Sequence, residues 1–476
     1  MKRTKGSPAN VFRGPVLRYL YDLTTSAHWG GADVGILRVE RQLARRARQH
    51  LGSGVEFCLY DRFRNLVLTI EDDLAAELTS GRMQIDFAPP PAPSIATLAR
   101  RRVRRAVLAN ATLYQAFQRL RGRPFTREDI LRIQMEELAS NGERKEPRSG
   151  PLRLADVPHR IANLDADTLL ISGGLDWDFK DVRALATLKR QYKFRYCTIV
   201  YDIIAILYPH LVVPELSPVL TRYFSDLVGL ADYAMCISER TRHDWTAFCR
   251  ESQADAGPAY VFPLGADLPT LDTVAHVDFP EVLRGKRFAL FVSTIEARKN
   301  HRMIYEAWDR CVRSRMIDPE RDRLVFVGRR GWGVNDLMRE LAANPATRDT
   351  LVVLNHVPDD LLRLLYQHCA FVVFPSLYEG YGLPLAEALA YGKPCISSDA
   401  GSLPEIGGDL VIRVDPKDTA RWSNMIARYL RSPQELEGMT ARIKAEFRPV
   451  AWDQAAAQFF SIINDISSSN ASKPRL

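Results

Sequence analysis

The sequence predicts an α/β chain of two doubly wound, Rossmann-like domains that face a central cleft. A length of 476 residues exceeds one ordinary domain. Both halves repeat one pattern, in which a strand-length apolar run leads through a glycine-containing turn into an amphipathic helix. In such domains the loops that follow the strands line the ligand crevice, so these turns are the first candidates for a binding site.

The composition describes a soluble globular protein, with 46% apolar and 26% charged residues. No apolar run approaches the roughly 20 residues of a membrane-spanning helix, and the first one is too short and too charged for a signal peptide. Seven cysteines occur without any Cys-x2-Cys pair. This pattern favours a reduced, cytoplasmic protein and argues against a zinc site.

The first half opens with an expected strand at 15–23, a glycine loop and a helix at 36–50. Gly35 would let the backbone approach a ligand closely. Arg38 either reaches a phosphate or lies on a solvated helix face. Further strands are expected at 168–172, 196–201 and 234–237, and Ser238 is placed to cap the helix that follows. An irregular stretch at 268–286 would be the hinge between the domains.

A proline-rich break at 88–94 precedes a basic segment that begins at Arg100 and ends at Arg123. The segment 100–123 holds eight arginines and no acidic residue, with apolar residues at helical spacing. Such a helix suits an anionic membrane surface, which would make the protein peripheral on the inner face of the cytoplasmic membrane. The alternative is a helix packed on its own domain. Nucleic acid is not expected, because no nucleic-acid module surrounds the segment.

The second half centres on residues 371–409, where an apolar strand leads into the turn Glu379-Gly380-Tyr381-Gly382 and a helix from about Leu383. The backbone amides of Gly382 and Leu383 would bind phosphate at the helix start. Glu379 lies in the turn and Glu387 about one helical turn further along, so both carboxylates would point at one site. A diphosphate-linked sugar fits an anion site bracketed by carboxylates. The competing interpretation is an ordinary surface turn and amphipathic helix.

These residues carry a family resemblance. The Glu-x7-Glu spacing at 379 and 387, around the letters EGYGLP, resembles the signature of the large retaining, two-domain glycosyltransferase superfamily, family 4, with the GT-B fold. The resemblance is strong over 286–415, moderate over 16–45 and 167–267, and absent over 51–160. The letters DLT and GILRVE near the N-terminus resemble the subgroup that builds bacterial surface polysaccharides.

The resemblance implies roles for individual residues. Glu387 would hold the ribose and Glu379 the transferred sugar, while Lys299 and Arg298 would stabilise the departing diphosphate together with the turn at 380–383. Lys299 could instead be a surface lysine at a helix start. The backbone at Val357 would read the base, and Glu405 would head a turn near the sugar.

The family's His-Asp pair is replaced here by Tyr201-Asp202, which removes the basis for a family acid–base role. Asp202 is left to accept a hydrogen bond from an acceptor hydroxyl or to cap the next turn.

The function predicted is retaining transfer of a sugar from a nucleoside-diphosphate sugar to a glycan or lipid-linked glycan in O-antigen, capsule or exopolysaccharide synthesis. GDP-mannose is one candidate donor, beside UDP-, dTDP- and other GDP-sugars. No Asp-x-Asp motif lies near the site, so no metal or cofactor is expected. Phosphorylases and epimerases share the fold, and a non-catalytic, membrane-associated assembly protein with a degenerate site is the alternative outside enzymes.

The expected domains are 1–275, with an insertion at about 88–150, then 276–448, and a helix at 449–476 that crosses back to the first domain.

Overall fold

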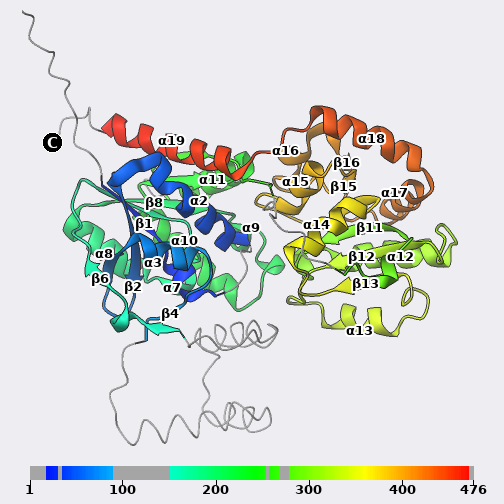
Figure 1. The fold of residues 1–476 in the computed structure, drawn as a ribbon, viewed down its shortest axis with the longest axis horizontal. Helices are drawn as coiled ribbons and strands as arrows, with labels where there is room; N and C mark the ends of the chain where they lie inside the picture. Colours follow the sequence, from blue (N-terminus) through cyan, green and yellow to red (C-terminus); the bar gives the residue numbers. More distant parts are fainter. Residues whose placement is uncertain (1–17, 31–34, 89–150, 254–256, 268–277, 471–476) are drawn as a thin grey trace, which may run out of the picture.

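The computed structural model describes residues 18–30, 35–88, 151–253, 257–267 and 278–470, with side chains described as far as residue 467. Almost all of the expected insertion at 88–150, including the segment 100–123, lies outside the described residues. The described chain forms two lobes, each built around its own sheet (Figure 1). No helix in these ranges is both long and apolar enough to cross a membrane.

The first lobe contains an eight-stranded sheet in the order β10-β9-β8-β7-β1-β2-β3-β6. The strands from β10 to β2 are parallel, whereas β3 is antiparallel to both β2 and β6. The bounds are β1 (Arg18–Asp22), β2 (Val55–Asp61), β3 (Leu66–Ile70), β6 (His159–Ile161), β7 (Thr168–Ser172), β8 (Arg195–Val200), β9 (Tyr233–Cys236) and β10 (Ala259–Val261). The helices are α1 (Thr24–His28), α2 (Gly35–Leu51), α3 (Asp72–Thr79), α7 (Asp176–Phe179), α8 (Val182–Tyr192), α9 (Ile204–Leu207), α10 (Leu216–Leu230) and α11 (Glu239–Glu251). A short parallel pair, β4 (Ile85–Asp86) and β5 (Leu152–Arg153), lies apart from this sheet.

The second lobe contains a six-stranded parallel sheet in the order β13-β12-β11-β14-β15-β16. Numbered from its first strand, this is the order 3-2-1-4-5-6 of dinucleotide-binding sheets. Successive strands are added on one side of β11 as far as β13 and on its other side from β14, so the strand order reverses between β11 and β14. The strands are β11 (Arg287–Val292), β12 (Asp322–Val327), β13 (Leu351–Leu354), β14 (Phe371–Phe374), β15 (Cys395–Ser397) and β16 (Ile412–Arg413). The helices are α12 (His301–Arg313), α13 (Asn335–Ala343), α14 (Asp359–His368), α15 (Leu383–Ala390), α16 (Leu403–Gly407), α17 (Thr419–Arg431) and α18 (Pro433–Glu446).

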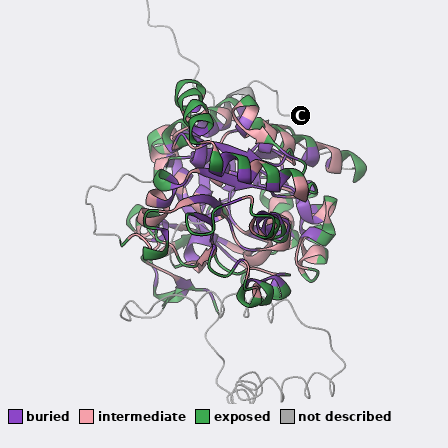
Figure 2. Ribbon diagram, turned by 90° about the vertical axis from the view of Figure 1, so that its right-hand side faces the viewer, coloured by how far each residue is buried: buried purple, intermediate pink, exposed green. Residues whose placement is uncertain are grey.

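The strands of the second sheet are buried on both faces, which explains their continuous apolar runs. All four residues of β14 are buried, and β11 is buried over its central four. Figure 2 shows the buried strands enclosed by helices whose outer faces are exposed. All seven cysteines are buried and free, as befits small apolar core residues.

The last described helix, α19 (Trp452–Asn470), runs back across the first lobe (Figure 1). It packs on α2, and its residues Ala455, Phe459 and Ile463 are buried with Val39 and Leu43 in one apolar cluster. The turn at Gly265 receives the helix, because a Cβ on Gly265 would lie 2.5 Å from the Trp452 ring. The Asp267 carboxylate also accepts a hydrogen bond from the Trp452 amide at 2.7 Å. The helix α19 is thereby fastened to the first lobe.

Candidate active site

The site lies where the strand order of the second sheet reverses. The neighbouring parallel strands β11 and β14 end beside each other at this point. A short 3-10 turn, Ala297–Lys299, follows β11, and the glycine turn 379–382 follows β14. Gly382 has a φ of +105°, a conformation that side chains disfavour, and it starts α15 with Pro384 in the first turn. Gly401 approaches the same turn so closely that a Cβ would lie 2.3 Å from the Glu379 carbonyl oxygen.

The Glu379 carboxylate is held by two cations. Lys299 Nζ lies 2.6 Å from one oxygen of Glu379, and Arg298 Nη1 lies 2.9 Å from the other. Arg298 also pairs with Glu296 at 2.9 Å. Burial alone would raise the pKa of Glu379, but the two cations outweigh burial and lower this pKa to about 2. The structure therefore brings together Glu379, Lys299 and Arg298 as an anionic carboxylate between two cations.

Glu387 lies one turn into α15 and pairs with the opposite lobe. Arg38 Nη1 of α2 lies 2.9 Å from one carboxylate oxygen, and the Tyr366 hydroxyl donates to the other at 3.1 Å. Burial raises the pKa of Glu387, while Arg38 and Tyr366 oppose that rise. Arg38 therefore does not lie on a solvated helix face, which was the competing interpretation of this residue.

The start of α15 faces the first lobe. The Gly380 carbonyl accepts hydrogen bonds from the hydroxyls of Ser238, at 2.8 Å, and Thr241, at 3.2 Å. The Tyr381 hydroxyl donates to the Leu264 carbonyl at 3.0 Å, so the Tyr381 side chain points into the first lobe. The N-cap residue Gly382 has no side chain that could cap α15, and the Leu385 amide donates to the Gly382 carbonyl at 3.0 Å.

Asp202 lies at the carboxyl end of β8, directly across from this turn. A Cβ on Gly380 would lie 3.0 Å from the Asp202 Cβ. Burial raises the pKa of Asp202, and the charge of Arg298 opposes that rise. Its carboxylate accepts a hydrogen bond from the Ile204 amide at 3.1 Å, where α9 begins. The capping role predicted as one alternative is therefore present, and the half-buried carboxylate also lies at the junction of the lobes.

Two other predicted donor-binding residues lie on separate elements, Gly35 at the start of α2 and Val357 in the loop after β13. Gly35 starts α2 with a φ of +51°, and a Cβ there would meet nothing within 4 Å. Val357 lies between β13 and α14 and packs partly against the core of the second lobe. Its neighbour His356 has a φ of +54°, which turns the backbone at this point.

Several residues at the site were missed by sequence reasoning or placed elsewhere by it. Tyr366 and Glu296 carry no motif that marks them as partners of Glu387 and Arg298. Glu405, expected to head a turn near the sugar, lies in α16, and its carboxylate accepts hydrogen bonds from the Glu239 and Arg240 amides of α11, at 2.8 and 2.6 Å. These two hydrogen bonds are further contacts between the lobes.

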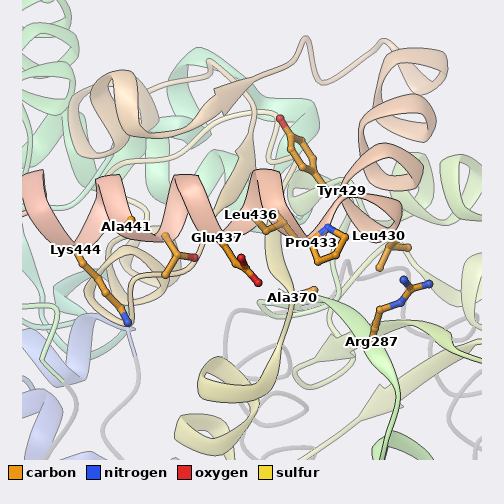
Figure 3. A pocket seen from close by; sticks show the side chains of 10 residues that line it. Arg287, Ala370, Tyr429, Leu430, Pro433, Leu436, Glu437, Ala441 and Lys444 are labelled. Carbon is orange, nitrogen blue, oxygen red and sulfur yellow. The ribbon is translucent and has the colours of Figure 1, made fainter.

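A cavity of about 470 Å³ lies elsewhere in the second lobe, between α17, α18 and the sheet (Figure 3). Arg287, the first residue of β11, and Ala370, just before β14, are part of its lining. The cavity therefore lies at the amino ends of the two strands whose carboxyl ends carry Lys299 and Glu379. It is not part of the candidate site.

Residues 278–446 match the family model described as glycosyl transferases group 1. The second lobe is a group 1 glycosyltransferase domain. The match contains the Glu379, Glu387, Lys299 and Arg298 cluster, and it confirms the family predicted from the Glu-x7-Glu motif. The enzyme class that this family represents is glycosyltransferase.

Two curated relatives are similar to part of the chain. The chain is 34% identical over 172 residues to O-antigen chain mannosyltransferase B of Escherichia coli, covering 36% of this chain and 44% of the relative. It is 28% identical over 220 residues to the serotype-specific mannosyltransferase WbdA of Escherichia coli, covering 44% of this chain and 26% of the relative. The chain thus spans less than half the length of these two relatives.

The fold of the whole chain also has a solved counterpart. Alr3699/HepE of Anabaena, solved in complex with UDP and glucose, aligns with a TM-score of 0.53 at 14% identity, covering 96% of this chain and 100% of that one. At this identity the likeness concerns the fold alone. The predicted fold class, two Rossmann-like domains in the GT-B arrangement, is confirmed.

Proposed function

We propose that this chain is a retaining glycosyltransferase that moves a sugar from a nucleoside-diphosphate sugar to a glycan or lipid-linked glycan of a bacterial surface polysaccharide. The observation that carries the proposal is the grouping of Glu379, Lys299 and Arg298 beside the start of α15, with Glu387 one turn further along. Cations and a helix start attract a diphosphate, and carboxylates accept hydrogen bonds from sugar hydroxyls. One donor molecule contains both chemical groups.

The residues of the site would have two roles, one toward the diphosphate and one toward the sugar and the ribose. Lys299, Arg298 and the amides of Gly382 and Leu383 would stabilise the negative charge that develops on the departing diphosphate, which is a major source of catalysis in group transfer. Glu379 would bind hydroxyls of the transferred sugar, and Glu387 would bind the ribose. The carboxylate of Glu379 is paired with Lys299 and that of Glu387 with Arg38. The hydroxyls of a bound donor would therefore replace these cations as hydrogen-bond partners of the two carboxylates.

Retention of the anomeric configuration would follow from attack on the same face of the sugar as the departing diphosphate. The acceptor oxygen forms the new bond to the anomeric carbon, the bond from that carbon to the phosphate oxygen breaks, and this oxygen takes the acceptor proton. No enzyme carboxylate need act as nucleophile in such a step. Asp202 would accept a hydrogen bond from the acceptor hydroxyl.

Mannose is the sugar that we infer for the donor, carried by GDP. The support is the word mannosyltransferase in the names of both Escherichia coli relatives, together with the surface-polysaccharide pattern of the first domain. A thermal-shift screen against GDP, UDP, dTDP and ADP tests the nucleotide, because a ligand that binds the folded state raises its apparent stability. Stabilisation by GDP alone supports GDP-mannose, and stabilisation by another nucleotide alone refutes it.

A transfer assay separates catalysis from a non-catalytic assembly role. Radiolabelled GDP-mannose and membrane-derived acceptor are incubated with the wild type and with Glu379→Ala. Product made by the wild type and lost in the variant supports the proposal. Equal product from both would refute the role of Glu379, and stabilisation by none of the four nucleotides would favour the non-catalytic alternative.

Contact with the inner face of the cytoplasmic membrane would bring the enzyme to a lipid-linked acceptor. The proposal rests on the eight arginines and interleaved apolar residues of the segment 100–123. Sedimentation with liposomes tests it. Pelleting with anionic but not with neutral vesicles is expected, and equal pelleting with both would rule out electrostatic attachment.

A further inference from the structure

Tyr378 immediately precedes Glu379 in the chain, yet its side chain belongs to the other lobe. The ring is buried in an apolar cluster with Ile204 and Leu211. It also packs against Tyr208, with ring centroids 4.8 Å apart. These partners follow β8 in the first lobe, so Tyr378 extends from the second lobe into a receptacle formed by the first.

The Tyr378 hydroxyl is held at both of its hydrogen-bonding positions. It accepts a hydrogen bond from Arg240 Nε at 2.6 Å and donates one to the Asp244 carboxylate. Arg240 and Asp244 form an ion pair at 3.0 Å on α11. Asp244 is buried, so its bond with the phenol is shielded from competing water.

The backbone of Tyr378 is joined to the site itself. Its carbonyl accepts a hydrogen bond from Arg298 Nη1 at 2.9 Å, and the same guanidinium nitrogen holds Glu379. The Leu377 amide donates to the Arg298 carbonyl at 2.9 Å. A shift of Tyr378 would therefore move both Glu379 and Arg298.

We propose that Tyr378 is a positioning residue, whose hydroxyl fixes Glu379 against the first domain by bonding to Arg240 and Asp244 of α11. This inference rests on the proposed function for its catalytic consequence. Glu379 belongs to the second domain, but its position is fixed by contacts with the first domain. Its alignment therefore requires the two domains to meet as they do here.

Tyr378→Phe removes the two hydroxyl bonds and keeps the ring in its cluster. We expect kcat to fall about tenfold or more, because small misplacements of a reacting group are costly, while the KM for the donor changes by less than about threefold. In the described part of the chain, Lys299 and the α15 amides make no side-chain bond to Tyr378, so these diphosphate contacts should persist even though Arg298 shifts, and nucleotide binding should remain close to that of the wild type.

Tyr19→Phe is the matched control. Tyr19 is also a buried tyrosine, and its hydroxyl donates to Asn464 of α19 at 3.3 Å, within the first lobe. It lies outside the machinery described above. A loss of kcat in Tyr378→Phe no larger than in Tyr19→Phe would overturn the proposal. A double variant Tyr378→Phe, Asp244→Ala that is no slower than Asp244→Ala alone would support it, because both substitutions then remove one interaction.

A distance measurement tests the positioning without an assay of activity. Spin labels at Ile161→Cys and Arg348→Cys report the separation of the lobes, since both positions are exposed and the seven native cysteines are buried. A broader distance distribution in Tyr378→Phe than in Tyr19→Phe supports the proposal, and identical distributions overturn it. If the wild type transfers no sugar, the proposed function fails while this result still decides the role of Tyr378.

Discussion

Arg38 of the first lobe and Glu387 of the second form an ion pair across the domain junction, with 2.9 Å between Nη1 and Oε1. Both side chains are largely buried, so removing one partner would leave the other charge poorly solvated. Glu387 is also the carboxylate proposed to hold the donor ribose. We expect the ribose to take the place of Arg38 on Glu387 and Arg38 to turn to the diphosphate.

The ribose contact predicts a preference for ribose over deoxyribose. The wild type should bind a nucleoside diphosphate about tenfold more tightly than its 2′,3′-dideoxy form, since a hydrogen bond to a charged group contributes roughly 1.5–3 kcal/mol. In Glu387→Gln the preference should shrink to within about threefold, because the acceptor is no longer charged. Isothermal titration measures both. Glu340→Gln, which alters an exposed pair with Arg302, is the control, and a preference that persists in Glu387→Gln would show that the ribose lies elsewhere.

The close approach of Gly401 to Glu379 gives a second prediction. Gly401→Ala places a Cβ 2.3 Å from the Glu379 carbonyl oxygen, at a φ of +63°. The Glu379 turn must move, so transfer activity should fall about 100-fold, in line with the cost of misplacing a reacting group by about 1 Å.

Gly285→Ala controls for backbone strain. Gly285 has a φ of +68°, but a Cβ there meets nothing within 4 Å. Both variants should lose about 1 kcal/mol of stability from backbone strain, and Gly401→Ala should lose more in thermal unfolding because its Cβ also meets the Glu379 backbone. Transfer assays should show a loss in Gly401→Ala alone. Equal activity of the two variants would mean that Glu379 tolerates the shift.

The buried Glu40 of α2 predicts a pH dependence of stability. Burial raises the pKa of Glu40 to about 8, against the opposing effect of hydrogen bonds from Ser26. Because the folded-state pKa lies above the unfolded value, the stabilisation is complete below about pH 4.5 and is lost as pH rises through 8. Between pH 5 and 8 the free energy of unfolding should fall by on the order of 4 kcal/mol, at about 1.4 kcal/mol per pH unit.

Denaturant unfolding of wild type and Glu40→Gln across this range measures the effect. The variant should show a flatter dependence on pH, because an amide does not ionise. Glu77→Gln, at an exposed pair with Arg82, should keep the wild-type slope. Parallel curves for wild type and Glu40→Gln would show that another group is responsible.

The elements around the site could be predicted from the sequence because their signals are local. The apolar run before Glu379, the glycines of the turn and the proline after Leu383 each act within a few residues, and β14 and α15 form where expected. Ser238 caps α11 by accepting from the Thr241 amide, also as predicted.

Contacts between the lobes could not be predicted, because they depend on how two separately folded domains meet. Nothing in the spacing of Arg38 and Glu387, 349 positions apart, indicates a shared ion pair. Glu405 is the clearest case, since nothing in its sequence context indicates that its carboxylate contacts the start of α11 on the opposite lobe. Likewise, the sequence around Tyr378 indicates only a tyrosine in a loop, and nothing in it predicts that the side chain is buried against Ile204 and Leu211 of the first lobe.

We propose that the donor diphosphate binds at Lys299, Arg298 and the start of α15. The test is isothermal titration of wild type and Lys299→Met with the nucleoside diphosphate and with the bare nucleoside. Lys286→Met is the control, because Lys286 precedes β11 and its ammonium donates to the Glu320 carbonyl, away from the site. Loss of one cation should weaken diphosphate binding about tenfold or more, since a charge-assisted contact contributes roughly 1.5–3 kcal/mol, and should leave nucleoside binding unchanged. Equal diphosphate affinity in wild type and Lys299→Met would contradict the account.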